Sequence, residues 1–571
     1  MPRNPVFSLL PLLAALLVAA CGDTTQPQPA PRADAADLII VNGKVHVADE
    51  ANTVVQAVAV KGNTILKLGT TDEIKALAGP ATRVIDAKGA TVTPGFTDSH
   101  AHFIDGGLAL KQVDLAGLTT LDEVQSAIRD FAAKQPAGAW VHGRGWLYQP
   151  FQNGSPTKAQ LDAVVPDRPA IMDCYDGHSV WVNSVVLKMA GITKATKDPL
   201  NGVIVRDPKT GEPTGHLKEA AQRLIEDILP KETVEDRRAA LKAAIAEANK
   251  YGVTAIQNAR TSIEDMALFD EAKQTGALTV RSYLAMLAHA GLTEADVDKM
   301  DAVRQRYGDD PLLRTGIVKM FADGVIESKT AAMLAPYVGT KSAGEPNMTA
   351  AEMNRIVAML DKHGWQIEIH AIGDRAIRMV LDAFEAAAKA NPAPARGRRH
   401  RVEHIEAISA QDIPRFGQLG VIASQQPMHA ALGDVNQAVP KGPWPDAIGP
   451  ERTSRAWAWK SILNAGGRVT FGSDWPVASI EAGQGIWLAS TRVKADGAED
   501  QRLSIDDAIA GYTRWAAYAS FDEKRRGTLE PGMLADIVVL TTDITAAPIP
   551  SKTGVVVATT IFDGKVVYEK K

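Results

Sequence analysis

Hydrophobic residues recur with two alternating periods in the second half of the chain. MTAAEMNRIVAMLDKHG places apolar residues at helical spacing between a Thr349/Glu352 capping pair and Gly364, and WQIEIHAIG then follows with the pattern of a strand. This order occurs three times, predicting helices over 348–364, 374–391 and 454–467 and strands that end at His370, His404 and Asp474. The alternation favours a parallel sheet with crossover helices. We predict a (β/α)8 barrel, because no glycine-rich nucleotide fingerprint of a doubly wound sheet follows an early strand.

The two ends of the chain have the pattern of short β-hairpins. Two-residue turn signals separate apolar runs at Asn42-Gly43 in 38–47, at Gly62-Asn63 in 57–69 and at Asp563-Gly564 in 559–569. ADIVVL (535–540) adds a strand near the C-terminus. Strands at both ends of a long middle predict one small β-domain built from the two termini.

The first residues have the pattern of an export signal. Arg3 precedes an apolar run that is too short to span a bilayer and that ends in Val18-Ala19-Ala20-Cys21. This ending resembles a bacterial lipobox, so we expect a lipoprotein signal peptide over 1–20 and lipidation of Cys21. A cleavage site with an incidental cysteine is the alternative. Residues 21–36, rich in Pro, Ala, Thr and Gln, are typical of a flexible tether.

Composition narrows the classes of function. Hydrophobic residues make up 45% of the 571 residues and charged residues 23%, as in an ordinary globular protein. The formal net charge of -5, with no basic stripe, argues against nucleic-acid binding. The two cysteines are Cys21 and Cys174, so acylation of Cys21 would leave Cys174 without a disulfide partner.

Candidate chemistry begins in TVTPGFTDSHAHF (91–103), where a strand pattern ends in His100-Ala101-His102. Side chains at i and i+2 lie on the same strand face, so both imidazoles point into one space and suit a divalent metal. For an isolated pair, two unrelated polar residues are the better explanation. However, five ligand-type residues fall at or near carboxyl ends of predicted strands, where barrel enzymes hold their active sites: His100, His102, His370, His404 and Asp474. A purely structural role does not account for five ligand-type residues at strand ends, so we predict a metal centre.

Lys319 is a sixth candidate, in LLRTGIVKMFADG, where an apolar strand again leads into a glycine turn. An ammonium is costly to bury at an inward barrel position, and a lysine considered alone is more often a salt-bridge partner or a surface residue. A lysine amine that captures carbon dioxide instead becomes a carbamate, an anionic oxygen donor able to bridge two cations. Four histidines, one aspartate and one carbamate would fit two metal ions ~3.5–4 Å apart.

These residues, in this order, resemble the ligand set of the amidohydrolase superfamily. The motifs PGFTDSHAHF, VKMFADG, EIHAIGDRA, RVEHIE, FGSDWPV and LEPGMLADIVVL are similar to those of its YtcJ-like branch, which includes N-substituted formamide deformylases. The resemblance runs from about residue 37 to the end of the chain. It implies a metal-bearing barrel over 94–527, an inserted α+β segment over 104–235 that covers the barrel mouth, and a β-sandwich formed by 37–93 and 528–571.

The resemblance also implies one or two divalent metal ions, with zinc the expected element. By this resemblance the buried ion has the ligands His100, His102 and Asp474, and the more exposed ion has His370, His404 and the bridging carboxylated Lys319. The metal makes hydroxide available from water at neutral pH. Asp474 takes the proton of that water and delivers it to the leaving nitrogen. The resemblance leaves open whether one or both metal positions are filled, because some relatives function with one metal.

The insertion supplies candidates for substrate binding. It contains VHGRGW (141–146), DCYDGHSVWVNS (173–184) and a predicted hairpin, GVIVRDPKTGEPTG (202–215). By the resemblance, His178 hydrogen-bonds the substrate carbonyl or its oxyanion, whereas a locally bonded loop histidine is the alternative.

Four further residues have two open interpretations each. Trp146 and Trp181 either line an apolar substrate pocket or belong to the core. Asp98 and Asp323, beside ligand positions, either orient the ligands or cap strand ends.

The leading functional hypothesis is a metal-dependent hydrolase of C–N bonds, acting on a small-molecule amide or an N-acyl or N-formyl amine. An aminohydrolase that deaminates a heterocycle is the enzymatic alternative, and a surface lipoprotein that captures a ligand without turnover is the alternative from another class. Six ligands with a proton-shuttling aspartate favour turnover. We expect an exported protein anchored by lipid to the bacterial envelope, and Gly22 after Cys21 permits transfer to the outer membrane. The sequence is also compatible with assembly of the chain into a homo-oligomer.

Overall fold

The computed structural model describes residues 35–546 and 555–571. The signal peptide predicted over 1–20 and the lipidation site at Cys21 lie outside the described residues, as does nearly all of the tether predicted over 21–36. Within the described ranges, no helix combines the length and the apolar character needed to cross a membrane.

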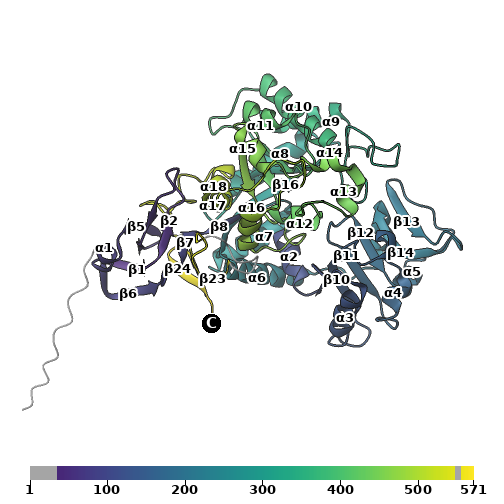
Figure 1. Cartoon of the computed structure of the whole chain (residues 1–571), viewed down its shortest axis with the longest axis horizontal. Coiled ribbons are helices and arrows are strands. Elements are labelled where there is room, and N and C mark those ends of the chain that lie inside the picture. The colour runs from purple at the N-terminus through teal and green to yellow at the C-terminus, as the bar shows by residue number, and fades with distance from the viewer. Residues whose placement is uncertain (1–34, 547–554) are drawn as a thin grey trace, which may run out of the picture.

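A parallel sheet of eight strands forms the centre of the molecule, with helices around it (Figure 1). In sheet order, which is also chain order, the strands are β8 (Phe96–Ala101), β15 (Val253–Asn258), β16 (Arg281–Leu287), β17 (Leu313–Phe321), β18 (Gln366–Ala371), β19 (Arg401–His404), β20 (Ile422–Gln425) and β21 (Arg468–Phe471). The crossover helices include α6 (Val234–Lys250), α7 (Ile263–Gln274), α8 (Glu294–Tyr307), α9 (Ala350–Lys362), α10 (Asp374–Ala390), α11 (Ile413–Leu419) and α15 (Trp459–Asn464), and α17 (Ile505–Gly511) and α18 (Arg514–Ala519) follow the last strand. The prediction of an eight-stranded parallel barrel is confirmed.

The barrel is nearly closed between β21 and β8. Single contacts bridge the two strands: the Asp474 amide donates to the His100 carbonyl at 2.6 Å, and the His102 amide donates to the Trp475 carbonyl at 2.7 Å. Gly472 comes so close that a Cβ there would lie 2.5 Å from the His100 amide nitrogen. The seam of the barrel therefore runs directly through the candidate metal ligands.

Two of the three predicted helix–strand units have the expected bounds. Thr349 caps α9, because its hydroxyl accepts from the Glu352 amide. The third differs: within 454–467 only α15 is helical, and β21 ends three residues before Asp474. Trp457 adopts a φ of 45° and donates its amide to the Glu406 carbonyl, a tertiary contact that replaces the helix.

Two sheets are formed by the chain ends. One has the order β5 (Thr64–Gly69), β4 (Ala57–Lys61), β1 (Ala36–Val41), β6 (Ala78–Asp86), and α1 (Thr71–Lys75) lies between β5 and β6 in the chain. The other has the order β24 (Lys565–Glu569), β23 (Val557–Phe562), β22 (Ile537–Leu540), β7 (Thr91–Pro94), β2 (Lys44–His46), β3 (Val54–Val55). Apolar residues of both sheets share one buried cluster, so the sheets pack face to face.

The hairpin predictions at the chain ends have mixed outcomes. The turns at Gly62-Asn63 and Asp563-Gly564 join antiparallel partners, β4 with β5 and β23 with β24, as predicted. The prediction at Asn42-Gly43 is wrong, because β1 and β2 belong to different sheets. Asn42 has a φ of 55°, a left-handed conformation that serves a chain crossing between sheets as well as a hairpin turn.

The insertion forms a separate sheet on the opposite side of the barrel from the terminal sheets (Figure 1). Its strand order is β13 (Gly202–Arg206), β14 (Pro213–Glu219), β12 (Ser179–Val182), β11 (Ala170–Cys174), β10 (Val141–Trp146), β9 (Val113–Asp114). The helices of this region are α2 (Phe103–Ala109), α3 (Leu121–Ala132), α4 (Lys158–Asp162) and α5 (Ser184–Met189). Strands β13 and β14 form the hairpin predicted over 202–215.

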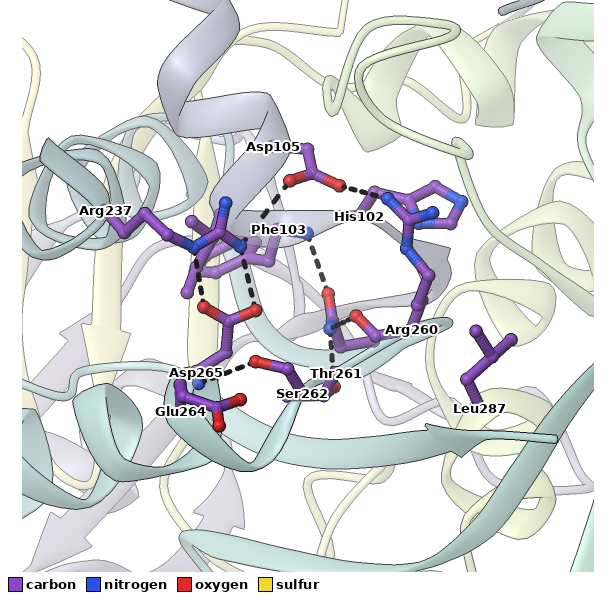
Figure 2. Close-up of a pocket in the computed structure, with 12 residues that line it drawn as sticks. His102, Phe103, Asp105, Arg237, Arg260, Thr261, Ser262, Glu264, Asp265 and Leu287 are labelled. Atoms are coloured by element: carbon purple, nitrogen blue, oxygen red, sulfur yellow. Dashed lines mark hydrogen bonds and ion pairs between the residues drawn. The ribbon is translucent and has the colours of Figure 1, made fainter. Parts of the chain in front are cut away.

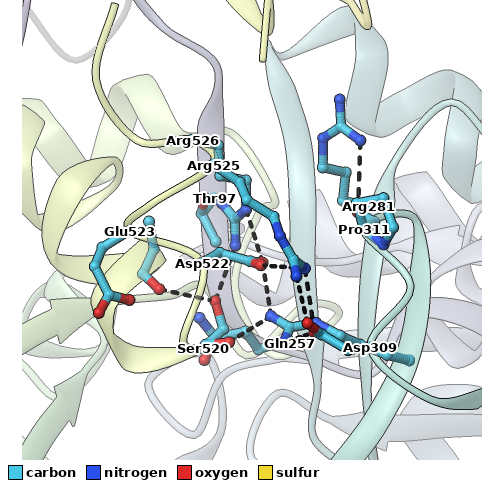
Figure 3. A network of polar contacts seen from close by, with 12 residues as sticks. Thr97, Gln257, Arg281, Asp309, Pro311, Ser520, Asp522, Glu523, Arg525 and Arg526 are labelled. Carbon is cyan, nitrogen blue, oxygen red and sulfur yellow. Dashed lines mark hydrogen bonds and ion pairs between the residues drawn. The ribbon is translucent and has the colours of Figure 1, made fainter. Parts of the chain in front are cut away.

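Charged contacts fix the amino-terminal end of the barrel. The Arg281 guanidinium makes a buried, bidentate pair with Asp536, joining β16 to the terminal sheets at 2.6 and 3.0 Å. Figure 3 shows the neighbouring network, in which Arg526 contacts Asp522 at 3.1 Å and the Thr97 hydroxyl at 2.6 Å. This end is tied to the C-terminal segment, whereas the carboxyl ends of the strands face a pocket.

Candidate metal centre

Strand β8 carries His100 and His102 to the carboxyl end of the barrel. Both imidazoles turn Nε2 toward Asp474, whose Oδ1 lies 3.4 Å from His100 and 3.1 Å from His102. Ligand atoms of the three residues all lie within 4.8 Å of one another. The structure therefore brings together the three residues that the resemblance assigns to one metal ion.

The backbone is strained at this end of the barrel. Asp474, His404 and Ile405 adopt φ values of 58°, 72° and 53°. Left-handed backbone costs a non-glycine residue about 1–3 kcal/mol, and a β-branched residue such as Ile405 rarely adopts it. Strain that the fold tolerates at two candidate ligands is typical of a functional site.

His370 and His404 end the neighbouring strands β18 and β19. Their ring centroids are 4.6 Å apart and their planes cross at 62°. The lone pair of a ring nitrogen lies in the ring plane, so steeply crossed rings can direct lone pairs at one ion. His370 Nε2 donates to the Gly324 carbonyl at 3.1 Å, which leaves Nδ1 as the ring atom able to bind a metal ion.

Lys319 lies on β17, fully buried among these histidines. Its Nζ donates to His100 Nε2 at 3.2 Å. Burial lowers the pKa of Lys319, although Glu368, Glu403 and Asp474 oppose the shift. A lowered pKa makes the neutral amine, the form that reacts with carbon dioxide, easier to reach.

Three of the candidate ligands, His100, His370 and His404, are held neutral at physiological pH. Burial lowers the pKa of His100 to about 4 and that of His370 to about 3. Burial likewise lowers the pKa of His404 well below its ordinary value. Burial alone would raise the pKa of Asp474, but His100 and the other histidines lower it well below the usual range. Neutral imidazoles and an ionised carboxylate are the protonation states in which these groups bind metal.

Asp98 and Asp323 brace the segments beside the ligands. Asp98 Oδ1 accepts the amides of His100 and Ser473, at 3.1 and 2.9 Å. Asp323 accepts the amides of Ile372 and Gly373, at 3.0 and 2.9 Å, and its Oδ1 lies 3.5 Å from His370 Nε2. Both carboxylates therefore fix ligand-bearing backbone at the barrel mouth.

Unpaired polar atoms fit a bound cation. Asp474 Oδ1 and His102 Nδ1 are buried and have no hydrogen-bond partner among the described residues. Leaving such atoms unsatisfied costs free energy, and a cation beside Asp474 would satisfy its oxygen. The donor set of imidazoles and carboxylate suits zinc or a similar divalent ion.

A model of the amidohydrolase family matches residues 83–568. The chain belongs to the amidohydrolase family. The protein named YtcJ from Bacillus subtilis (strain 168) is 31% identical over 543 residues, which cover 92% of this chain and 98% of YtcJ. An N-substituted formamide deformylase from Arthrobacter pascens is 29% identical over 558 residues, 94% of this chain and 98% of the deformylase. Among solved structures, an uncharacterized metal-dependent hydrolase from Pyrococcus furiosus has a TM-score of 0.66 at 24% identity, with 88% and 98% of the two chains covered.

A pocket of about 450 Å³ opens over the centre of this amidohydrolase. The barrel ligands form its floor, and residues 173–178 of the insertion form one wall. His178 lies in that wall and its Nδ1 bonds Glu219 Oε2 at 3.0 Å. Burial alone would lower the pKa of His178, but the hydrogen bond and charge of Glu219, with Asp176 and Glu327, raise it to about 9. His178 is therefore a charged donor facing the pocket at neutral pH.

The structure places both tryptophan candidates in the core of the insertion. Trp146 is fully buried and donates its Nε1–H to the Met172 carbonyl at 2.8 Å. Trp181 is equally buried and donates to the Thr157 carbonyl at 2.8 Å. Neither lines the pocket. Of the two open interpretations, the structure favours core packing over a substrate-lining role.

A side pocket of about 410 Å³ adjoins the mouth at His102 (Figure 2). Asp105 and Arg260 line both pockets, and the Arg260 guanidinium contacts Asp105 at 3.2 Å. On the far side Arg237 pairs with Asp265 at 2.7 Å. Two ion pairs, Arg260 with Asp105 and Arg237 with Asp265, thus line the side pocket.

Two residues of the centre were missed by sequence reasoning. Glu403 contacts His100, and His429 lies beside Asp474 with its Nε2 4.0 Å from Oδ2. His429 follows the barrel strand β20 in QQPMHA, so its position relates to a strand end as that of His404 does. The four-residue strand IASQ is too short and too polar for its hydrophobic pattern to reveal it.

Proposed function

We propose that this amidohydrolase hydrolyses the C–N bond of an amide or of an N-acyl or N-formyl amine. The observation that carries the proposal is the Asp474 carboxylate beside the His100 and His102 imidazoles on the floor of an open pocket. His100, His102 and Asp474 would hold one divalent cation, and His370, His404 and carboxylated Lys319 a second. When bound, such a cation supplies hydroxide from water at neutral pH and polarises a carbonyl.

Asp474 would act as the proton carrier. Its carboxylate accepts a proton from the attacking water and returns it to the nitrogen as the C–N bond breaks. One C–O bond forms, one C–N bond breaks, and the products are a carboxylic acid and an amine. Formate is the acid when the substrate is an N-formyl amine.

His178 would stabilise the negative charge that develops on the carbonyl oxygen. Glu219 holds the imidazole by its Nδ1, so Nε2–H is free to donate into the pocket. A fixed donor aimed at an oxyanion typically contributes about 10²–10³ in kcat. The name of the Arthrobacter pascens relative supports a formamide as the first substrate to assay.

Turnover of a panel of N-formyl and N-acyl amines tests the proposal, with Asp474→Asn as the decisive variant. We expect turnover by the wild type and a loss of about 10²–10⁴ in Asp474→Asn, the range for a lost proton carrier. Metal content tests the carbamate separately. The wild type should carry two equivalents of metal per chain, and Lys319→Ala should carry fewer. Full turnover by Asp474→Asn would exclude this mechanism.

We also propose that Cys21 carries a lipid that anchors the exported protein in the bacterial envelope. The Val18-Ala19-Ala20-Cys21 ending of the apolar run supports this. Mass spectrometry of membrane-extracted protein should find an acylated N-terminal Cys21, and Cys21→Ser should release the protein from the membrane. An unmodified cysteine would refute the anchor.

A further inference from the structure

His429 faces the reacting site without belonging to the predicted ligand set. It lies on α12 (Pro427–Leu432), is 7% exposed and lines the mouth pocket. Its Nε2 is buried and has no hydrogen-bond partner in the part of the chain that the structure describes. That atom lies 4.0 Å from Asp474 Oδ2, too far for a direct hydrogen bond. A buried ring nitrogen without a partner calls for one that the described chain does not supply.

The orientation of His429 relative to His404 differs from that of His370. His429, His404 and Asp474 do bring ligand atoms within 4.8 Å of one another. However, the His404 and His429 rings are stacked, with centroids 5.9 Å apart and planes only 8° from parallel. The planes of His370 and His404 cross at 62° instead. The metal content of His429→Ala separates a metal ligand from a substrate-binding residue.

Glu406 lies on the Nδ1 side of the His429 ring. Its Oε2 accepts the Trp444 indole N–H at 2.7 Å, which holds the carboxylate in place. Its Oε1 lies 3.7 Å from His429 Nδ1. A carboxylate on that side favours the tautomer with the proton on Nδ1, so Nε2 presents a lone pair to the pocket.

We infer that His429 Nε2 and Asp474 Oδ2 together bind the nitrogen of the scissile amide, with His429 accepting its N–H. The inference rests on the proposed function. A nitrogen between the two atoms can lie about 2.9 Å from each, the length of an ordinary hydrogen bond. As the C–N bond breaks, Asp474 delivers one proton to this nitrogen, while the hydrogen that the nitrogen already carries points to His429. The substrate class is therefore an amide whose nitrogen bears a hydrogen.

Paired substrates test this assignment. The kcat/KM of wild type, His429→Ala and His429→Gln is measured on an N-monosubstituted formamide and on its N,N-disubstituted counterpart. His289→Ala, a substitution at an exposed histidine, is the matched control. Metal per chain and the melting temperature of each variant are measured alongside.

We expect His429→Ala to lose about 10-fold or more in kcat/KM on the monosubstituted amide, as for one lost hydrogen bond at a reacting nitrogen. The same variant should change little on the disubstituted amide and should keep its metal. His429→Gln, whose amide oxygen can accept, should recover part of the loss. Equal losses on both substrates, or loss of a metal equivalent from His429→Ala, would overturn the inference while leaving the hydrolase intact. Absence of turnover and metal in the wild type would instead overturn the proposed function.

Discussion

Glu403 accepts the Nδ1–H of His100 at 2.5 Å, with both side chains fully buried inside the barrel. Arg401 holds the carboxylate in turn, with its Nε 2.8 Å from Glu403 Oε1. Because His100 is neutral, this bond fixes its proton on Nδ1 and turns the Nε2 lone pair toward Asp474. The tautomer of a candidate metal ligand is thus set by a residue that touches no metal.

Replacing Glu403 by glutamine should weaken metal binding. The glutamine amide can donate to Nδ1, which would move the proton of His100 to Nε2 and block the lone pair. Loss of such a supporting partner typically costs about 10–100-fold in metal affinity. Titration against a competing chelator measures the change. Glu523→Gln is the control, because that glutamate pairs with Arg399 on the surface of the barrel; equal affinity in the two variants would contradict the prediction.

Replacing Glu219 by glutamine should change the pH dependence of stability. The pKa of His178, about 9 in the folded protein, lies above its ordinary value of 6.5. Charged His178 therefore contributes stability that is fully present below about pH 6.5 and is lost as pH rises through about 9. Without Glu219, burial dominates and the pKa of His178 falls.

Melting temperatures between pH 6 and 10 measure this effect. The gap between wild type and Glu219→Gln should be widest at the acidic end and should narrow as His178 deprotonates in the wild type. The alkaline limb of the kcat/KM profile should move to lower pH in the variant. A gap that is constant across the range would show that His178 does not titrate there.

Truncating Trp146 should reduce stability. Its indole is fully buried and packs edge-on against Tyr148 and Phe151, with centroids 5.3 and 5.4 Å away. Trp146→Ala should lower the free energy of unfolding by about 3–5 kcal/mol, the cost of a large buried cavity. Denaturant titration measures it, with Trp487→Ala, at a partly buried helix position, as the smaller comparison. Unchanged stability with a higher KM would instead assign Trp146 to substrate.

The barrel was predictable because its strands and helices differ in hydrophobic period. The candidate ligand positions could be proposed because His370, His404 and Asp474 each lie at or near the carboxyl end of such a strand. The Asn42-Gly43 pair led to a wrong hairpin prediction, because a left-handed turn can join two different sheets as well as the two strands of a hairpin. Trp146 and Trp181 could not be placed from the sequence, because their burial depends on contacts within the folded insertion. His429 could not be placed, because the short polar strand before it is fixed by contacts with residues far along the chain.

Metal content per chain, measured by elemental analysis on purified full-length protein, tests the centre most directly. Wild type and His289→Ala should each carry one or two equivalents of zinc or a similar divalent ion. His102→Ala should lose at least one equivalent, because its Nε2 lies 3.1 Å from the carboxylate that would share the ion. A wild-type protein that binds no divalent metal, or a His102→Ala variant that retains all of it, would contradict the metal centre at the end of β8.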